Sequence, residues 1–514
     1  MKKTSFIAGT IILILVNVIV RSLGFIYKIL LSRLIGATAI GLYQMVFPFL
    51  MMIITLPTAG LPIAVSKLIA EEKAHGRREG VYRILFFSLV LGFLLSLILS
   101  ILVSFNIDYI INNLFKNPDL YYPILWTIPS ICIITFSNIL RGFFYGLKEI
   151  APAASAQIIE QVLRIIFILS YLYYRPPTNP IMAATIAIIG IFIGELCGLL
   201  YLILKLNFFN MPASIKAGRL RKALSCHIMG SLLFIAIPIT ISRLISVLMQ
   251  TVNSILIPQK LQILGYSPLM SLEIFGKISG MAMPLLFLPF TVTNALVLNI
   301  IPNISEQLAV NNWSDIENKT SLAIKITLLV AIPTSLVYGF FGQHICRLIY
   351  AQEGIGDYLY ILNWGLIFLC LQHTSSGILH GIGKQVITTI NYILGMLIQL
   401  YCTYFLIPNP KYGIKGYFIG FLLSTFLIFG LNFLVLARHI RLQINISKSL
   451  ILPLLASVTM VIIMGYSYRA LYILLANNGL SFILSLGLGG CFYFLFLSVS
   501  KSLDIKYILQ LIKR

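Results

Sequence analysis

Long apolar runs separated by short polar stretches dominate the chain from end to end. A helix needs about 20 mostly apolar residues to cross the hydrocarbon core of a bilayer, and the pattern predicts fourteen such helices. A β-barrel is not favoured, because its strands would appear as short segments of alternating polarity. The predicted helices cover residues 6–34, 41–70, 84–105, 121–141, 153–173, 181–204, 229–254, 272–302, 321–343, 359–380, 386–407, 415–437, 450–470 and 480–500.

The composition strengthens this prediction. Of 514 residues, 59% are hydrophobic and only 10% are charged, whereas a soluble protein carries about a quarter of charged residues. The predicted fold class is therefore an all-α polytopic membrane protein. Its seven cysteines are dispersed and form no C-x-x-C pair, so we interpret them as small buried side chains rather than disulfides or metal ligands.

The basic residues indicate topology rather than nucleic-acid binding, since they are scattered among the predicted spans. The net charge is +22, from 37 Lys and Arg against 15 Asp and Glu. With a cytoplasmic N-terminus and fourteen alternating helices, the inner segments hold 22 Lys and Arg and the outer segments hold 8. Cytoplasmic loops collect such residues, so both termini are predicted to be cytoplasmic in a multi-pass protein of the cell membrane.

The chain also repeats itself. Ser137–Gly142 (SNILRG) matches Ser376–Gly381 (SGILHG) at four of six positions, with an offset of 239. Gly41–Glu71 aligns without gaps on Gly276–Glu306 at an offset of 235, and both segments are rich in proline. This predicts two pseudo-symmetric six-helix lobes that carry substrate between them, with bends in the proline-rich helices. The predicted division is an N-lobe at 1–206, a cytoplasmic linker at 207–228, a C-lobe at 229–440, two further helices at 441–500 and a basic cytoplasmic tail at 501–514.

Positive charges inside predicted spans are the main candidates for chemistry. Arg21, Arg243 and Lys277 lie on the first, seventh and eighth predicted helices, which should line a cavity between the lobes. An ionisable residue within the membrane marks a functional site by default, and the arginine fork fits phosphate. We therefore expect these three residues to bind an anionic head group. The alternative is that they pair with Glu273, with backbone carbonyls or with interfacial water.

A second charged group lies on the fifth and sixth predicted helices. Glu160 and Arg164 are four residues apart, which favours a local ion pair, and Glu195 lies on the next helix. These residues form either a structural pair or an ion-coupling site. Gly190, Gly194 and Gly198 are also spaced by four, which predicts close packing of that helix on a neighbour.

Several kinds of chemistry find no support. No Walker A loop and no H-E-x-x-H motif occur in the sequence, and no catalytic triad, metal site or cofactor is predicted. We interpret His373 and His380, seven residues apart, as packing or polar-lining residues. A membrane-bound glycosyltransferase would use acids near an extracytoplasmic loop. Glu353 and Asp357 are the only acids in the loop between the predicted helices 321–343 and 359–380, and no large soluble loop accompanies them. The sequence therefore predicts a transporter and not an enzyme.

Four stretches resemble a known family. They are RSLGF from residue 21, FPFLMMIITLPTAGLPIAVSKLIAE from 47, LRGFFYGLKEIAPAASAQIIEQVLR from 140 and GKISGMAMPLLFLPFTVTNALVLNIIPNISE from 276. The chain resembles the stage V sporulation protein B branch of the multidrug/oligosaccharidyl-lipid/polysaccharide (MOP) exporter superfamily. That resemblance implies two six-helix lobes plus two helices, and flipping of an undecaprenyl-diphosphate-linked sugar, as in the lipid II flippases.

The resemblance also implies site residues. An arginine that begins the helix 1 motif of the lipid II flippases falls on Arg21, and a cavity arginine of helix 8 falls on Lys277. A second helix 1 arginine falls on Tyr27, and the basic end of the helix 2 motif has no counterpart around Pro48 to Met52. Only part of the cationic set is therefore implied for this chain.

Together these observations predict a flippase that moves a polyprenyl-diphosphate-linked sugar from the inner to the outer leaflet by alternating access, serving spore cortex synthesis. Its expected partners are a lipid-linked anionic oligosaccharide, membrane lipid and cell-wall synthesis enzymes, with no nucleic acid. The alternative function is an ion-coupled multidrug (MATE-type) exporter. That function requires buried carboxylates, for which Glu160 and Glu195 are the candidates.

Overall fold

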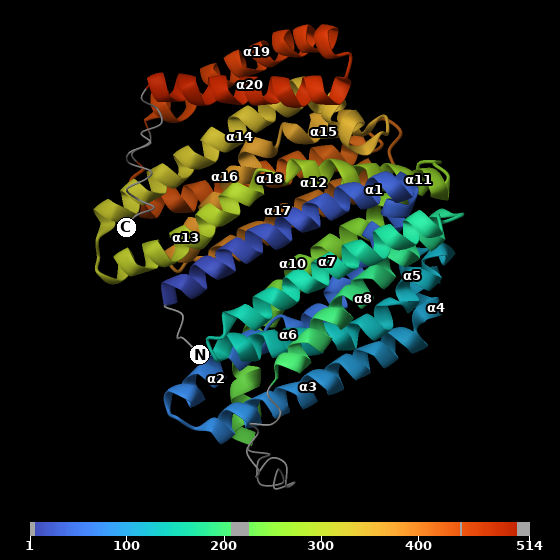
Figure 1. The fold of residues 1–514 in the computed structure, drawn as a ribbon, viewed down its shortest axis with the longest axis vertical. Coiled ribbons are helices and arrows are strands. Elements are labelled where there is room, and N and C mark those ends of the chain that lie inside the picture. The colour runs from blue at the N-terminus through green and yellow to red at the C-terminus, as the bar shows by residue number, and fades with distance from the viewer. Residues whose placement is uncertain (1–5, 207–225, 443–444, 501–514) are drawn as a thin grey trace. The chain divides into compact units, whose positions relative to one another are not determined.

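The computed structural model describes residues 6–206, 226–442 and 445–500, and these ranges are almost entirely helical (Figure 1). Twelve of the described helices are long and apolar enough to cross a membrane, or thirteen when a bent pair is counted as one span. The predicted all-α membrane fold is confirmed, whereas the predicted count of fourteen helices is not. By their internal contacts the residues divide into two compact units, an N-terminal unit (Met1–Gly280) and a C-terminal unit (Met281–Arg514).

The N-terminal unit contains the first group of helices. Its elements are α1 (Phe6–Thr58), α2 (Leu61–Ala74), α3 (Arg78–Phe105), α4 (Ile107–Tyr109), η1 (Ile110–Phe115), η2 (Pro118–Leu120), α5 (Tyr121–Leu125), α6 (Thr127–Gly146), α7 (Ile150–Tyr174), α8 (Pro180–Lys205), α10 (Cys226–Ile263), α11 (Pro268–Phe275) and the start of the π-helix η5 (Gly276–Ala282). Its core joins α2, α3 and α6 through Val65, Ile69, Leu85, Ile139 and Phe143, all nearly inaccessible to solvent.

The C-terminal unit contains the second group. Its elements are α12 (Met283–Leu286), α13 (Phe290–Ala309), α14 (Trp313–Tyr350), α15 (Ile355–Asn363), α16 (Leu366–Gly381), α17 (Gln385–Leu406), α18 (Lys415–His439), η6 (Ser447–Ile451), α19 (Leu452–Leu475) and α20 (Asn478–Val499). Its core joins α13, α14, α16 and α18 through Ile304, Ile324, Ile378 and Leu436. The predicted lobe boundaries stay a prediction, and residues 207–225 of the predicted linker and the tail 501–514 lie outside the described residues.

The long element α1 consists of two helices that meet at Gly36, where φ is 80° and ψ is 171°. The hydroxyl of Ser32 donates to the carbonyl oxygen of Gly280 at 3.3 Å, and Gln44 Nε2 donates to that of Ser279 at 2.9 Å. On one straight helix Ser32 and Gln44 would be about 18 Å apart, yet they bond to adjacent residues. The chain therefore reverses direction at Gly36, as the predicted gap between residues 34 and 41 required.

The predicted continuous helix over 272–302 is broken instead. The chain passes from α11 through the π-helix η5 and the short α12, and turns at residues 287–289 before α13 begins. Pro284 and Pro289 have no backbone N–H, so each removes a donor from a helical ladder. The predicted bend is thus a full interruption of the helix.

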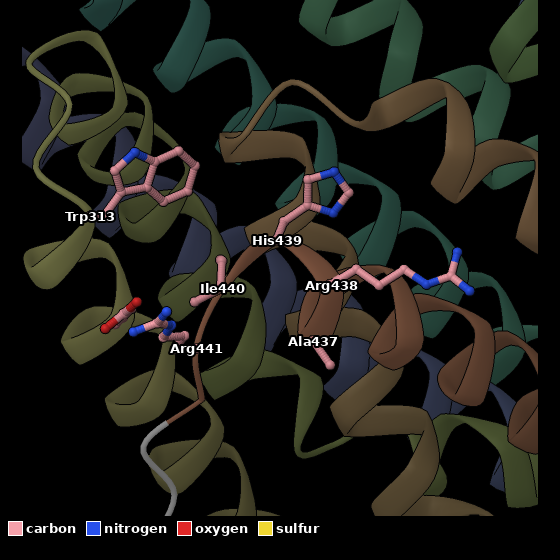
Figure 2. A pocket seen from close by; sticks show the side chains of 7 residues that line it. Trp313, Ala437, Arg438, His439, Ile440 and Arg441 are labelled. Carbon is pink, nitrogen blue, oxygen red and sulfur yellow. The ribbon is translucent and has the colours of Figure 1, made fainter.

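A surface pocket in the C-terminal unit is lined by the start of α14 and the end of α18, so these two helix ends lie close together. Figure 2 shows Trp313, at the start of α14, beside the residues that end α18. The pocket has a volume of about 420 Å³ and is lined by Trp313, Glu317 and residues 437–441. Since both helix ends lie on one side, an even number of spans must separate them. The helices α14, α17 and α18 are three, so the number is even when α15 and α16, which meet at 55°, are counted as one bent span.

Candidate functional site

A network of four charged side chains lies inside the N-terminal unit. Arg141 Nη2 on α6 lies 2.7 Å from Glu160 Oε2 on α7 and 3.4 Å from Glu195 Oε2 on α8. Glu160 Oε1 in turn lies 2.5 Å from Arg164 Nη2 on the same helix. All four side chains are buried, with 10–15% of their surface exposed. The predicted Glu160–Arg164 ion pair is present, whereas a role in ion coupling stays a prediction.

The glycines of α8 bring Glu195 to this network. A Cβ atom at Gly194 would lie only 2.8 Å from the backbone oxygen of Glu160, and one at Gly198 would lie 3.4 Å from that of Ala156. The backbones of α7 and α8 are therefore in close contact along the glycine spacing that the sequence displays. This close packing brings the Glu195 carboxylate on α8 near enough to contact the Arg141 guanidinium on α6.

The network contains two positive and two negative groups, so its charges balance. This pairing offsets part of the free-energy cost of burying them. Two guanidinium groups face two carboxylates, and side-chain amides take further hydrogen bonds: Arg141 Nη1 donates to Asn138 at 3.4 Å and Arg164 Nη1 donates to Gln161 at 3.3 Å. A buried ion is costly unless it is paired and hydrogen-bonded. Removing one member would therefore leave a partner charge uncompensated within the apolar bundle.

Sequence reasoning missed Arg141, which it used only as a marker of topology at the end of a span. Its partners lie 19 and 54 residues away in the sequence, so no local spacing reveals the pairing. The available signal was its place in the repeated SNILRG motif, where the second copy has His380. In the structure His380 is exposed and its Nε2 is 2.9 Å from the hydroxyl of Thr388, and the packing or polar-lining role expected for it stays a prediction.

The three predicted anion-binding residues have different surroundings. Lys277 Nζ lies 2.8 Å from Glu273 Oε1 one helical turn away, and these side chains are 20% and 44% exposed. Arg243 is exposed on α10, and no ion pair is recorded for it within the described part of the chain. The backbone of Arg21 belongs to α1, but its side chain lies outside the described residues. Convergence of the three on one ligand stays a prediction.

Arg21 and Arg243 lie on the first and seventh predicted helices, and the repeat pairs them only loosely. At the repeat's offset of 235, Arg21 aligns with Leu256, thirteen residues after Arg243. The two arginines are therefore not strict counterparts in the repeat.

Lys277 is next to a reciprocal contact between two glycines. A Cβ atom at Gly41 would lie 2.1 Å from the carbonyl oxygen of Leu272, and one at Gly276 would lie 1.9 Å from that of Ala37. Each contacted residue precedes the opposite glycine by four, and both pairs differ by 235 in number. The two contacts are therefore equivalent, as a local two-fold axis between the two helices would make them. The residues that they relate are the ones that the repeat alignment pairs at an offset of 235. We call this contact the glycine crossing.

These features define a class: a multi-pass membrane protein whose apolar helices enclose a network of paired charges. Comparison with known proteins then gives the family. The model of the family described as "Polysaccharide biosynthesis protein" matches residues 6–307, and the MatE family model matches residues 238–405. The chain belongs to this polysaccharide biosynthesis protein family, within the MOP exporter superfamily.

Individual relatives agree. The chain is 27% identical over 455 residues to Stage V sporulation protein B of Bacillus subtilis (strain 168), covering 87% of this chain and 86% of the relative. It is 23% identical over 465 residues to Lipid II flippase MurJ of the same organism, covering 85% and 83%. A solved inward-facing MATE transporter of the MOP superfamily has the same fold, with a TM-score of 0.67 at 19% identity over 81% of this chain and 93% of that one. The protein is thus a membrane transporter or flippase in general terms.

Proposed function

We propose that this protein flips a polyprenyl-diphosphate-linked sugar, a precursor of peptidoglycan or polysaccharide, from the inner to the outer leaflet. The observation that carries the proposal is the exposed Arg243 on the apolar span α10. A guanidinium is expensive in hydrocarbon and is retained where it faces a wet cavity or a ligand. A second cation, Lys277, has one nearby carboxylate on its own helix. An anionic, membrane-borne substrate suits such a set.

In this mechanism Arg21, Lys277 and Arg243 hold the diphosphate, while the polyprenyl tail stays in the bilayer. The guanidinium groups bind phosphate oxygens in a forked geometry. Lys277 exchanges its Glu273 partner for phosphate when substrate enters, because both ligands offer an anionic oxygen. Membrane potential or an ion gradient supplies the energy for alternating access between the two leaflets.

The cellular role follows the relatives. One relative is named for stage V of sporulation and another for flipping lipid II, so in a spore-forming host we place this protein in the supply of cortex precursor. Cell-wall synthesis enzymes would then receive the flipped lipid. Both termini are cytoplasmic in this account, because that orientation gathers most Lys and Arg on the inner side.

The role of the cations can be tested in reconstituted vesicles with a fluorescent lipid-linked sugar. Replacing Arg21 and Lys277 together by alanine should slow flipping at least about tenfold, since each charged hydrogen bond contributes about 1.5–3 kcal/mol. Arg33→Ala is the matched control, because Arg33 is an exposed arginine on the same element α1. Equal flipping by the double variant and the wild type would exclude the diphosphate-binding role.

The second candidate is an ion-coupled exporter of cationic drugs. The observation in its favour is that Glu195 has one ion partner in the described chain, Arg141 at the longer distance of 3.4 Å. A carboxylate held this loosely can exchange its partner for a proton or cation. Drug resistance conferred by the wild type and abolished by Glu195→Gln would favour this function over the first.

A further inference from the structure

The surface pocket of the C-terminal unit contains none of the cations proposed for transport. Its volume is about 420 Å³, and it is lined by Trp313 and Glu317 near the start of α14 and by residues 437–441 at the end of α18. Figure 2 shows Trp313 and Arg441 on one side of the chain that leaves α18, and Arg438 extending away on the other side. The lining therefore combines an aromatic ring, two guanidinium groups and a carboxylate.

The length of α18 places this pocket at the depth of the lipid headgroups. No charged residue occurs between Lys415 and Arg438, and the residues between them, Gly416–Ala437, are helical throughout. At 1.5 Å per residue they extend about 33 Å, which matches the roughly 30 Å of the hydrocarbon core of a bilayer. Arg438 and Arg441 therefore follow directly after the apolar span. Trp313, lining the same pocket, is a residue type enriched at this depth.

The charges that line the pocket favour an anion. Arg438 and Arg441 are both exposed, and neither forms an ion pair or a hydrogen bond within the described residues. With His439 neutral, these two guanidinium groups and the one carboxylate of Glu317 give the pocket a net charge of +1. The indole N–H of Trp313 is a further donor. The carboxylate is an acceptor, so the lining suits an anion that also carries hydroxyl groups.

An exposed apolar face of α18 leads from the bilayer to this pocket. Leu423, Phe426 and Leu434 are 50%, 58% and 58% exposed, and a Cβ atom at Gly430 would have nothing within 4 Å. Ala437, which is exposed and lines the pocket, continues the series. Successive members are three or four positions apart, so they lie on one face of the helix. An acyl chain lying along this face would bring its headgroup to the pocket.

We propose that the pocket binds the headgroup of an anionic phospholipid of the phosphatidylglycerol type, whose acyl chains lie along the exposed face of α18. Arg441 and the indole N–H of Trp313 bind the phosphate, and Arg438 adds positive charge at the rim. Glu317 accepts hydrogen bonds from the glycerol hydroxyls. Basic pockets between membrane helices bind anionic headgroups in this way. The lipid is a resident of the bilayer and not the transported molecule, so the inference goes beyond the proposed function and does not depend on it.

The test is lipid binding to the purified full-length protein, measured by native mass spectrometry. The protein is titrated with phosphatidylglycerol and, separately, with phosphatidylcholine of the same acyl chains. Arg441→Gln removes one cation, and Trp313→Phe removes the indole donor while retaining an aromatic ring. Arg78→Gln is the matched control, because Arg78 is an exposed arginine at the start of α3, on the same predicted side of the membrane, and its loss changes the net charge equally.

The wild type should bind phosphatidylglycerol more tightly than phosphatidylcholine. Arg441→Gln should weaken phosphatidylglycerol binding about fivefold, and the double variant with Arg438→Gln more than about tenfold. Trp313→Phe should weaken it about two- to fivefold, since one hydrogen bond is lost, whereas Arg78→Gln should have no effect. Equal weakening by Arg441→Gln and Arg78→Gln would mean that only the overall charge matters, and would overturn the inference.

Two competitors distinguish the lipid from other sources of phosphate. Glycerol phosphate has the same headgroup without acyl chains, and polyprenyl diphosphate represents the proposed transport substrate. Neither should displace phosphatidylglycerol when added at equal concentration. Displacement by glycerol phosphate would make the pocket a site for free anions, and displacement that only polyprenyl diphosphate achieves would assign it to the transported lipid. Either result would overturn the assignment to a resident phospholipid and would leave the test of the proposed function in vesicles unaffected.

Discussion

Replacing Gly276 by alanine should force apart the two helices of the glycine crossing. The added Cβ atom would lie 1.9 Å from the carbonyl oxygen of Ala37 and 2.8 Å from the backbone nitrogen of Gly41. Both atoms belong to the backbone, so no side chain can rotate away. Relief requires the nearest contact to lengthen from 1.9 Å to at least 3.0 Å, which moves one helix as a body and disturbs the nearby hydrogen bond from Gln44 to Ser279.

The free-energy cost follows from two opposing terms. Overpacking costs about 1–3 kcal/mol, or more where the backbone must shift. Exchange of glycine for alanine stabilises a helix by up to about 1 kcal/mol, because alanine has the higher helix propensity. We therefore expect a net loss of about 1–2 kcal/mol in the free energy of unfolding, which for a chain of 514 residues corresponds to a fall in Tm of about 1–2 °C.

The assay is thermal unfolding of the purified protein in detergent, monitored by the loss of its monodisperse fraction. Gly430→Ala on α18 is the matched control, because a Cβ atom there has nothing within 4 Å and only the gain in helix propensity remains. Gly41→Ala should resemble Gly276→Ala, and the double variant should lose less than the sum, since one displacement makes room for both. Equal Tm values for Gly276→Ala and Gly430→Ala would refute the reasoning.

Three further predictions concern the network and the topology. Gly194→Ala should lower the Tm more than a lipid-facing glycine substitution, because its Cβ would lie 2.8 Å from a backbone oxygen of α7; the same thermal assay measures this, and an unchanged Tm would count against the close packing. Arg141→Met should cost about 3–5 kcal/mol by stranding a buried carboxylate, and adding Glu195→Gln should restore part of the Tm; no recovery would mean that the ion pair is not what the arginine stabilises. A cysteine at the exposed Glu353 should react with an impermeant maleimide from outside the cell, and one at the exposed Gln385 should not; the reverse result would invert the predicted topology.

Local spacing made part of the site predictable. The Glu160–Arg164 pair and the packing of Gly194 both depend on a separation of four residues, which the helical repeat converts directly into proximity. The pairing of Lys277 with Glu273 has the same spacing and was one of the two alternatives for that lysine. Each of these contacts lies on one helix or between two consecutive helices.

Contacts between distant parts of the chain were not predictable in the same way. Arg141 joins the network through residues on two other helices, and no local spacing distinguishes it from a topological marker. The repeat alignment paired Gly41 with Gly276 but did not indicate that the two touch. The interruption between η5 and α13 was expected only as a bend, because proline removes a donor without fixing how far the chain then turns.

The central claim, that the substrate is a lipid-linked anion, is tested most directly by a transport competition in one preparation. Vesicles containing the purified protein are given a fluorescent polyprenyl-diphosphate sugar and, separately, a labelled organic cation, each with and without a membrane potential and a proton or sodium gradient. The account predicts transfer of the lipid-linked sugar across the bilayer and no uptake of the cation. Gradient-driven movement of the cation together with no transfer of the lipid-linked sugar would contradict it.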